Sequence, residues 1–149
     1  MLLLRQLARV NSFLKTRGYL KMNTLIICLL IAAILPYLAR IPVASAMAKA
    51  GGYNNDEPRA QQALLHGFGG RAVAAHKNSF EALIIFGLAV VTALATSHIT
   101  PLIEYLAIAF IVSRVIYHII YLMGISTLRS LIWFVGLVCS LTIMGLCIN

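Results

Sequence analysis

Polar side chains cluster between residues 71 and 81, directly before an apolar run, in a chain that is otherwise strongly hydrophobic. On a helix, Arg71, Asn78 and Glu81 stand at i, i+7 and i+10, which places them within roughly 80° of one another. Polar groups at the edge of a bilayer are costly and usually face a bundle interior or a wet cavity. A cation, an amide and a carboxylate on one stripe suit a small zwitterionic ligand, and they equally suit contacts between helices.

A second polar stripe lies within the apolar segment 101–123. Its members stand at i, i+3, i+4 and i+7 and so share one helical face: Arg114, Tyr117, His118 and Tyr121. Arg114 lies roughly nine residues from the end of this segment, which is near mid-membrane at about 1.5 Å per residue. A guanidinium at that depth needs a carboxylate partner.

Two acidic residues, Glu81 and Glu104, lie within the apolar segments. Glu104 starts its segment near the opposite membrane surface, so Glu81 is the expected partner of Arg114. Such a pair has two interpretations, a structural link between two helices or part of a binding site, and the sequence leaves both open.

A third polar group, Arg129-Ser130, opens the last apolar segment and is followed one turn later by Trp133. A cation at a helix start opposes the helix dipole, which favours an anionic partner there. His76 and His118 alone do not make a metal site, which usually needs three or four ligands, so no metal is predicted. No phosphate-binding or dinucleotide fingerprint is present.

Composition and segment lengths predict the elements that carry these groups. The 149 residues are 61% hydrophobic and 11% charged, whereas soluble domains carry roughly a quarter charged residues. Four apolar spans, at about 23–46, 71–97, 101–123 and 128–148, each approach the ~20 residues that a helix needs to cross a bilayer. We therefore expect an all-α, multi-pass membrane protein. The short second and third links predict that the last three helices alternate up and down in a four-helix bundle.

The distribution of charge bears on orientation and partners. The net charge is +8, but the basic residues lie before the first span and along loops and helix ends, so no nucleic-acid partner is predicted. With a start at Met22, the positive-inside rule places the long polar loop 48–70 in the cytoplasm and both termini outside. Residues 1–21 carry five basic residues that oppose this orientation. We expect a basic extension at 1–21 and a membrane domain at 22–149.

The cysteines Cys28, Cys139 and Cys147 all lie in apolar runs. Three cysteines at membrane depth do not suggest a disulfide framework or a zinc site. They are expected to pack as small hydrophobic residues.

The order and spacing of the polar motifs resemble the MAPEG family, the membrane-associated proteins in eicosanoid and glutathione metabolism. The resemblance covers about residues 22–149. It rests on three motifs, which are Arg71…His76-Lys77-Asn78…Glu81, Arg114 with Tyr121 seven residues later, and Leu128-Arg129-Ser130. The nearest resemblance is to a bacterial branch, through the Tyr53-Asn54-Asn55 loop, which implies the bacterial inner membrane. The family implies a four-helix subunit, a homotrimer, and glutathione held between subunits near the cytoplasmic face.

The resemblance also implies roles for individual residues. Arg129 matches the arginine near the glutathione sulfur, with Ser130 beside it, and a nearby cation favours the thiolate. Glu81 matches a contact to the glutathione amino group. The residues expected to hold glutathione are Arg71, Lys77, Asn78, Glu81, Arg114, Tyr117 and Tyr121.

Three positions depart from the family pattern. Lys77 stands where well-studied members have an arginine, and it lacks the planar fork that grips a carboxylate. Ala74 replaces an expected arginine, and Tyr117 replaces an expected histidine. These departures fall at the end of the site that holds the peptide, while the thiol-activating end is kept.

The resulting expectation is a glutathione-dependent transferase or peroxidase that acts on lipophilic electrophiles or lipid peroxides. Its expected partners are membrane lipids, further copies of the chain, and a small lipophilic substrate. One alternative is a non-enzymatic binding or scaffold protein with a degenerate glutathione site. A small transporter is less favoured, because proton-coupled exporters with four helices usually carry an acid in the first span, and none lies there.

Overall fold

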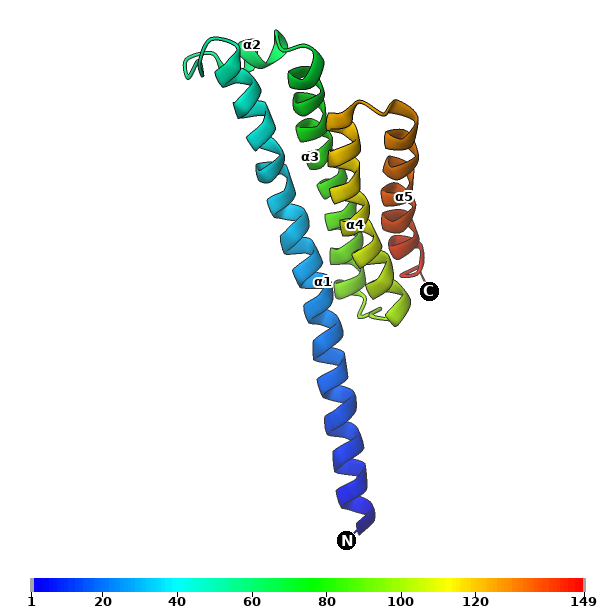
Figure 1. The fold of residues 1–149 in the computed structure, drawn as a ribbon. Helices are drawn as coiled ribbons and strands as arrows, with labels where there is room; N and C mark the ends of the chain where they lie inside the picture. The colour runs from blue at the N-terminus through cyan, green and yellow to red at the C-terminus, as the bar shows by residue number, and fades with distance from the viewer. Residues whose placement is uncertain (1, 149) are drawn as a thin grey trace.

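The computed structural model describes residues 2–148, with side chains described from residue 23 to residue 148. The described chain is helical and has no strand in this range. Its helices, shown in Figure 1, are α1 (Leu2–Lys49), α2 (Pro58–Ala63), α3 (Gly67–Ala95), α4 (Pro101–Met123) and α5 (Ser126–Gly145). The all-α fold class predicted from composition is confirmed.

Four helical segments of the described chain are long and apolar enough to cross a membrane, which confirms the predicted number of spans. They are Asn23–Lys49, Gly67–Ala95, Pro101–Met123 and Ser126–Gly145. Two of them start earlier than predicted. The second begins at Gly67 rather than residue 71, so Arg71 lies one turn inside the helix. The fourth begins at Ser126, so Arg129 is the fourth residue of α5 rather than its second.

Local backbone chemistry explains where α4 ends and α5 begins. Gly124 adopts a left-handed conformation, with φ of 82°, and its N–H donates to the carbonyls of Ile120 and Tyr121. The N–H of Ile125 also donates to the Ile120 carbonyl. This arrangement is a Schellman-type C-cap, for which glycine is the favoured residue. The cap reverses the chain at once, so α4 and α5 lie antiparallel.

Helix α1 runs without a break through Pro36 and Pro42. In Figure 1 the N-terminal part of α1 extends well beyond the bundle. The division between an extension and a membrane domain near residue 22 stays a prediction.

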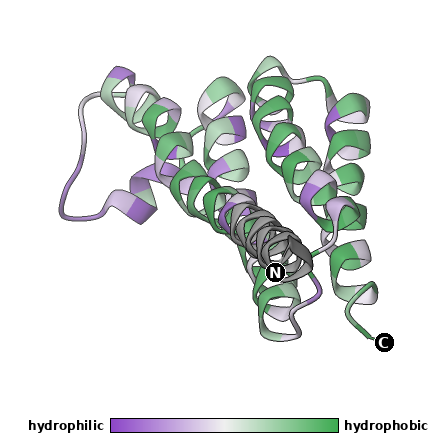
Figure 2. Ribbon diagram, turned by 90° about the horizontal axis from the view of Figure 1, so that it is seen from below, coloured by the Kyte–Doolittle hydropathy of each residue, from purple (hydrophilic) through white to green (hydrophobic). Residues whose placement is uncertain are grey.

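The core is built from small and aromatic side chains on the faces where helices meet. Phe86 of α3 stacks on Phe110 of α4, with ring centroids 3.9 Å apart and planes 2° from parallel. Ala89, Ala93 and Ala107 are each 0% exposed. Lipid tails are as apolar as the core, so close packing rather than water exclusion holds membrane helices together. Figure 2 shows hydrophobic colouring around the helices, whereas the loop between α1 and α3 is hydrophilic.

The polar loop after α1 is held by hydrogen bonds from its own side chains. Asn54 Oδ1 accepts from the backbone N–H groups of Asp56 (2.9 Å) and Glu57 (3.1 Å). Gln61 donates from Nε2 to the Gly52 carbonyl (2.6 Å) and accepts from the Asn54 N–H (3.0 Å). The loop, the start of α3, the end of α4 and the start of α5 all lie at one end of the bundle (Figure 1). We call this the polar end.

Candidate functional site

Asn78 on α3 links the two charged groups that the sequence expected to pair directly. Arg114 on α4 donates from Nη1 to Asn78 Oδ1 (3.4 Å), and Asn78 Nδ2 donates to Glu81 Oε2 (2.8 Å). Arg114 and Glu81 do not form an ion pair in the described structure, so the predicted contact between them is wrong. The amide fits between them because its oxygen faces the cation and its N–H₂ faces the carboxylate.

Arg114 is 3% exposed and is satisfied largely by groups other than carboxylates. Its Nη2 donates to two carbonyls of α5, those of Ile132 (3.3 Å) and Trp133 (3.4 Å). The guanidinium also lies 4.6 Å from the centre of the Tyr117 ring, a favourable cation–π contact. Its Nε is buried without a hydrogen-bond partner. Backbone carbonyls of α5 and the Tyr117 ring therefore stabilise the buried guanidinium, where a carboxylate was expected to do so.

Gly136 on α5 makes room for Arg114. A Cβ at this position would lie 2.8 Å from Arg114 Nη2 and 3.0 Å from Ser113 Oγ. Glycine thus lets α5 approach α4 closely enough for its carbonyls to reach the guanidinium, as small residues do in membrane helix pairs.

A cavity of about 90 Å³ lies beside this cluster, between α3, α4 and α5. Polar lining groups come from all three helices, and apolar ones complete the wall. The lining includes Glu81, Phe110, Arg114, Trp133, Gly136 and Ser140. The cavity therefore joins a carboxylate and a guanidinium to an apolar wall that continues into the bundle.

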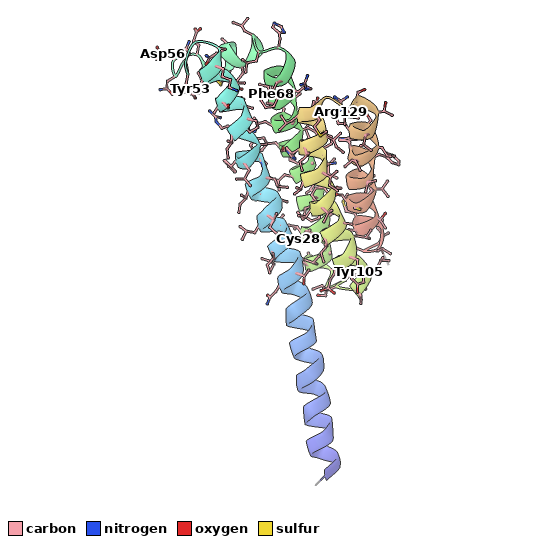
Figure 3. All side chains as sticks on the ribbon, in the orientation of Figure 1. Cys28, Tyr53, Asp56, Phe68, Tyr105 and Arg129 are labelled. Atoms are coloured by element: carbon pink, nitrogen blue, oxygen red, sulfur yellow. The ribbon has the colours of Figure 1, made fainter. Side chains whose placement is uncertain are left out.

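Arg129 lies at the polar end, near the start of α5 (Figure 3). Its guanidinium is 4.5 Å from the centre of the Tyr121 ring on α4. Tyr121 in turn packs edge-on against Tyr117, with ring centroids 5.4 Å apart. No carboxylate within residues 23–148 forms an ion pair with Arg129. Ser130 is exposed, and its Oγ donates to the Ser126 carbonyl within the helix (3.1 Å).

Arg71 does not join the other polar groups of α3. Its Nε donates to the Leu122 carbonyl (3.1 Å), and its guanidinium packs against Gly124. The last carbonyls of a helix lack partners and carry partial negative charge, so a cation there caps α4. Lys77, by contrast, is exposed on the surface of α3.

His76 and His118 each link two helices. His118 Nδ1 donates to the Arg114 carbonyl (2.6 Å), and His118 Nε2 shares a hydrogen bond with Ser79 Oγ on α3 (2.6 Å). His76 Nδ1 donates to the Pro36 carbonyl on α1 (2.9 Å). A carbonyl can only accept, so each Nδ1 carries a proton. Within the described residues, no group of three metal-ligating side chains lies close together.

Three residues that shape the site were not singled out from the sequence: Ser79, Gly136 and Ser140. Gly136 and Ser140 are four residues apart, which is the small-x-x-x-small spacing of close helix contacts in membranes. That spacing was an available signal for Gly136. Ser79 gives no comparable signal, because only the packing of α3 against α4 brings His118 to it.

Among known protein families, the model of the MAPEG family matches residues 24–149 of the chain. The chain belongs to the MAPEG family. No curated protein and no solved structure matches it. The resemblance based on the polar motifs is thereby confirmed, and the matched segment contains every residue of the polar cluster described above. In this MAPEG chain the polar cluster lies on α3, α4 and α5, three of the four spans within the matched segment.

Proposed function

We propose that this MAPEG protein binds glutathione at the polar end of α3, α4 and α5, and uses it as a transferase or peroxidase on lipophilic compounds. The observation that carries the proposal is the unpaired Arg129 guanidinium, held on the Tyr121 ring at the first turn of α5. The partial positive charge at a helix start adds to the charge of Arg129. Both favour an anion at this place, and a thiolate is such an anion.

The carboxylate of Glu81 provides a second matching group. Asn78 holds its Oε2, while Oε1 has no partner among the described side chains. Arg114 fixes the Asn78 amide from the other side, so the carboxylate is held in one orientation. An exposed, oriented carboxylate suits the ammonium group of glutathione. Glu81 and Arg129 thus offer opposite charges, one for the ammonium group and one for the thiolate of glutathione.

Glutathione, when bound, supplies a thiolate that either replaces a leaving group on an electrophile with a carbon–sulfur bond or, with a second glutathione, reduces a hydroperoxide to alcohol and water as the disulfide forms. Arg129 favours the deprotonated thiol through its charge. Ser130 would donate to the sulfur only after its hydroxyl turns away from the Ser126 carbonyl. Lys77 and Tyr121 would hold the peptide, and the cavity beside Arg114 would take part of the apolar substrate.

Assembly and orientation form part of the same proposal. Glu81 and Ser130 are exposed in the single chain, which leaves them available to a neighbouring copy in a homotrimer. The polar end carries the Lys and Arg side chains of the loops and helix ends within residues 23–148, so the positive-inside rule supports a cytoplasmic polar end in a bacterial cell. The lipophilic substrate would arrive laterally from the bilayer.

The direct test is turnover by the full chain in liposomes, with glutathione and either an aryl halide or a lipid hydroperoxide. The wild type should consume glutathione, Arg129→Ala should lose at least about ten-fold in rate, and Arg129→Lys should keep part of it, because hydrogen bonds to a charged group contribute about 1.5–3 kcal/mol. Equal rates for wild type and Arg129→Ala would contradict the proposal. Absence of turnover together with intact oligomers would favour the scaffold alternative.

A further inference from the structure

A second surface feature lies at the polar end, away from the site described above. It is an open groove of about 430 Å³ between the end of α1 and the link from α2 to α3. Its lining includes Ala46, Lys49, Leu64, His66 and Phe68. None of these residues belongs to α4 or α5, so the groove is separate from the cluster around Asn78 and Arg129. We call it the α1–α2 groove.

The walls of the α1–α2 groove are fixed by close packing. Met47 of α1 is 1% exposed and Gln62 of α2 is 5% exposed, and Gln62 Nε2 donates to Met47 Sδ (3.9 Å). A Cβ at Gly69 would lie 3.2 Å from Ala46 Cβ and 3.1 Å from Leu65 Cβ. Glycine therefore lets the first turn of α3 press against both neighbours. The groove is a preformed feature of the fold.

Two of the large apolar side chains that line this groove are exposed. Leu64 is 75% exposed and Phe68 is 47% exposed. Phe68, labelled in Figure 3, lies at the start of the span Gly67–Ala95, and Leu64 lies just before that span, where a membrane protein passes from hydrocarbon to headgroups. Apolar side chains at this level insert into the boundary between headgroups and acyl chains.

The charge around the α1–α2 groove is complementary to an anion. Lys49 is exposed at its edge, and His66 adds ring nitrogens. Within residues 23–148, all Lys and Arg of the loops and helix ends belong to the polar end, and the segment 78–113 has none. Basic pockets beside membrane helices bind anionic headgroups. The groove thus combines a cationic edge with apolar side chains, which matches the two parts of one phospholipid.

We propose that the α1–α2 groove binds an anionic phospholipid, with its phosphate at Lys49 and His66 and its acyl chains against Leu64 and Phe68. This proposal does not depend on glutathione. A bound lipid would hold α2 and the start of α3 at the membrane surface.

Native mass spectrometry of the full chain in detergent tests the proposal, with dioleoyl phosphatidylglycerol and dioleoyl phosphatidylcholine as probes. The chain should retain phosphatidylglycerol in preference to phosphatidylcholine. Lys49→Gln should weaken that binding by about five-fold, the factor expected for one lysine near an anionic lipid surface. Phe68→Ser should also weaken it, because the acyl chains lose their contact.

The matched control is Arg59→Gln, which removes one positive charge from α2 but does not line the groove. It should change binding by less than about two-fold, since a charge outside the pocket acts only through a screened field. An equal loss in Arg59→Gln and Lys49→Gln would show diffuse attraction and overturn the proposal. Equal retention of both lipids, or displacement of the lipid by millimolar inorganic phosphate, would overturn it as well. Circular dichroism and gel filtration of each variant establish that the fold is intact.

Discussion

The guanidinium of Arg129 lies over the ring of Tyr121, 4.5 Å from its centre, and this contact joins α5 to α4 at the polar end. A ring face holds a cation without neutralising its charge, whereas a carboxylate would hold the cation and also neutralise it. Arg129 therefore stays available to an external anion. Tyr117 packs against Tyr121 from within the bundle, so the supporting ring is itself held in place.

This support predicts different effects for two Tyr121 variants. Tyr121→Ala should lower glutathione affinity by about two- to thirty-fold, since a cation–π contact contributes about 0.5–2 kcal/mol. Tyr121→Phe keeps the ring and should retain most of the affinity. Glutathione titration of the two purified variants makes the comparison. A loss in Tyr121→Phe as large as in Tyr121→Ala would mean that the hydroxyl, rather than the ring, carries the effect.

The close approach of α5 to Arg114 predicts that Gly136→Ala destabilises the protein. The added methyl would meet Nη2 at 2.8 Å, and overpacking of this kind costs about 1–3 kcal/mol. Gly145→Ala is the matched control, because a Cβ there meets nothing within 4 Å. Unfolding in detergent, followed by circular dichroism, should separate the two variants. Equal stability would contradict the packing described for Gly136.

The hydrogen bond between Ser79 and His118 predicts a stability difference between two buried serines. Ser79→Ala removes a bond between α3 and α4 and should cost about 0.6 kcal/mol, the average for such bonds between membrane helices, and no more than about 1.7 kcal/mol. Ser140 is also buried, but its Oγ donates to the Gly136 carbonyl of its own helix. Ser140→Ala should therefore cost less. The reverse order in a denaturation series would show that Ser79 does not link the helices.

Substitutions at Arg71 and Lys77 should have different effects: the first should lower stability, and the second should weaken glutathione binding. Arg71→Gln removes the cap of α4 and should cost about 0.3–1 kcal/mol of stability, with glutathione affinity unchanged. Lys77→Gln removes an exposed charge near Asn78 and should weaken glutathione binding while stability stays the same. Thermal unfolding and glutathione titration of both variants test this. Weaker binding in Arg71→Gln would restore the role that the family resemblance gave it.

The spans and the polar stripes could be predicted from the sequence because they follow from apolar length and helical period. The end of α4 near Gly124 and the short links between helices could likewise be predicted from the sequence. The partners of Arg114 could not be predicted in this way. They include two backbone carbonyls of α5, and carbonyls are present at every residue, so only the approach allowed by Gly136 selects them.

The role of Arg71 was hidden for a related reason. Its spacing from Asn78 and Glu81 places it on their stripe, but it lies seven residues before Asn78, about 10 Å along the helix, and so beside the end of α4. Helix starts set by a glycine with positive φ, such as Gly67 at 55°, are hard to locate when several glycines lie together.

The central claim is that glutathione binds through the oriented Glu81 carboxylate, and isothermal titration of glutathione into the purified protein tests it most directly. Glu81→Gln should weaken binding by at least about ten-fold, because a charge-assisted hydrogen bond is worth about 1.5–3 kcal/mol. Glu104→Gln removes the other acid within a span, on the first turn of α4, and should leave affinity unchanged. Saturable binding that falls only in Glu81→Gln is the result that we predict. No saturation at millimolar glutathione, or an equal loss in both variants, would contradict the account.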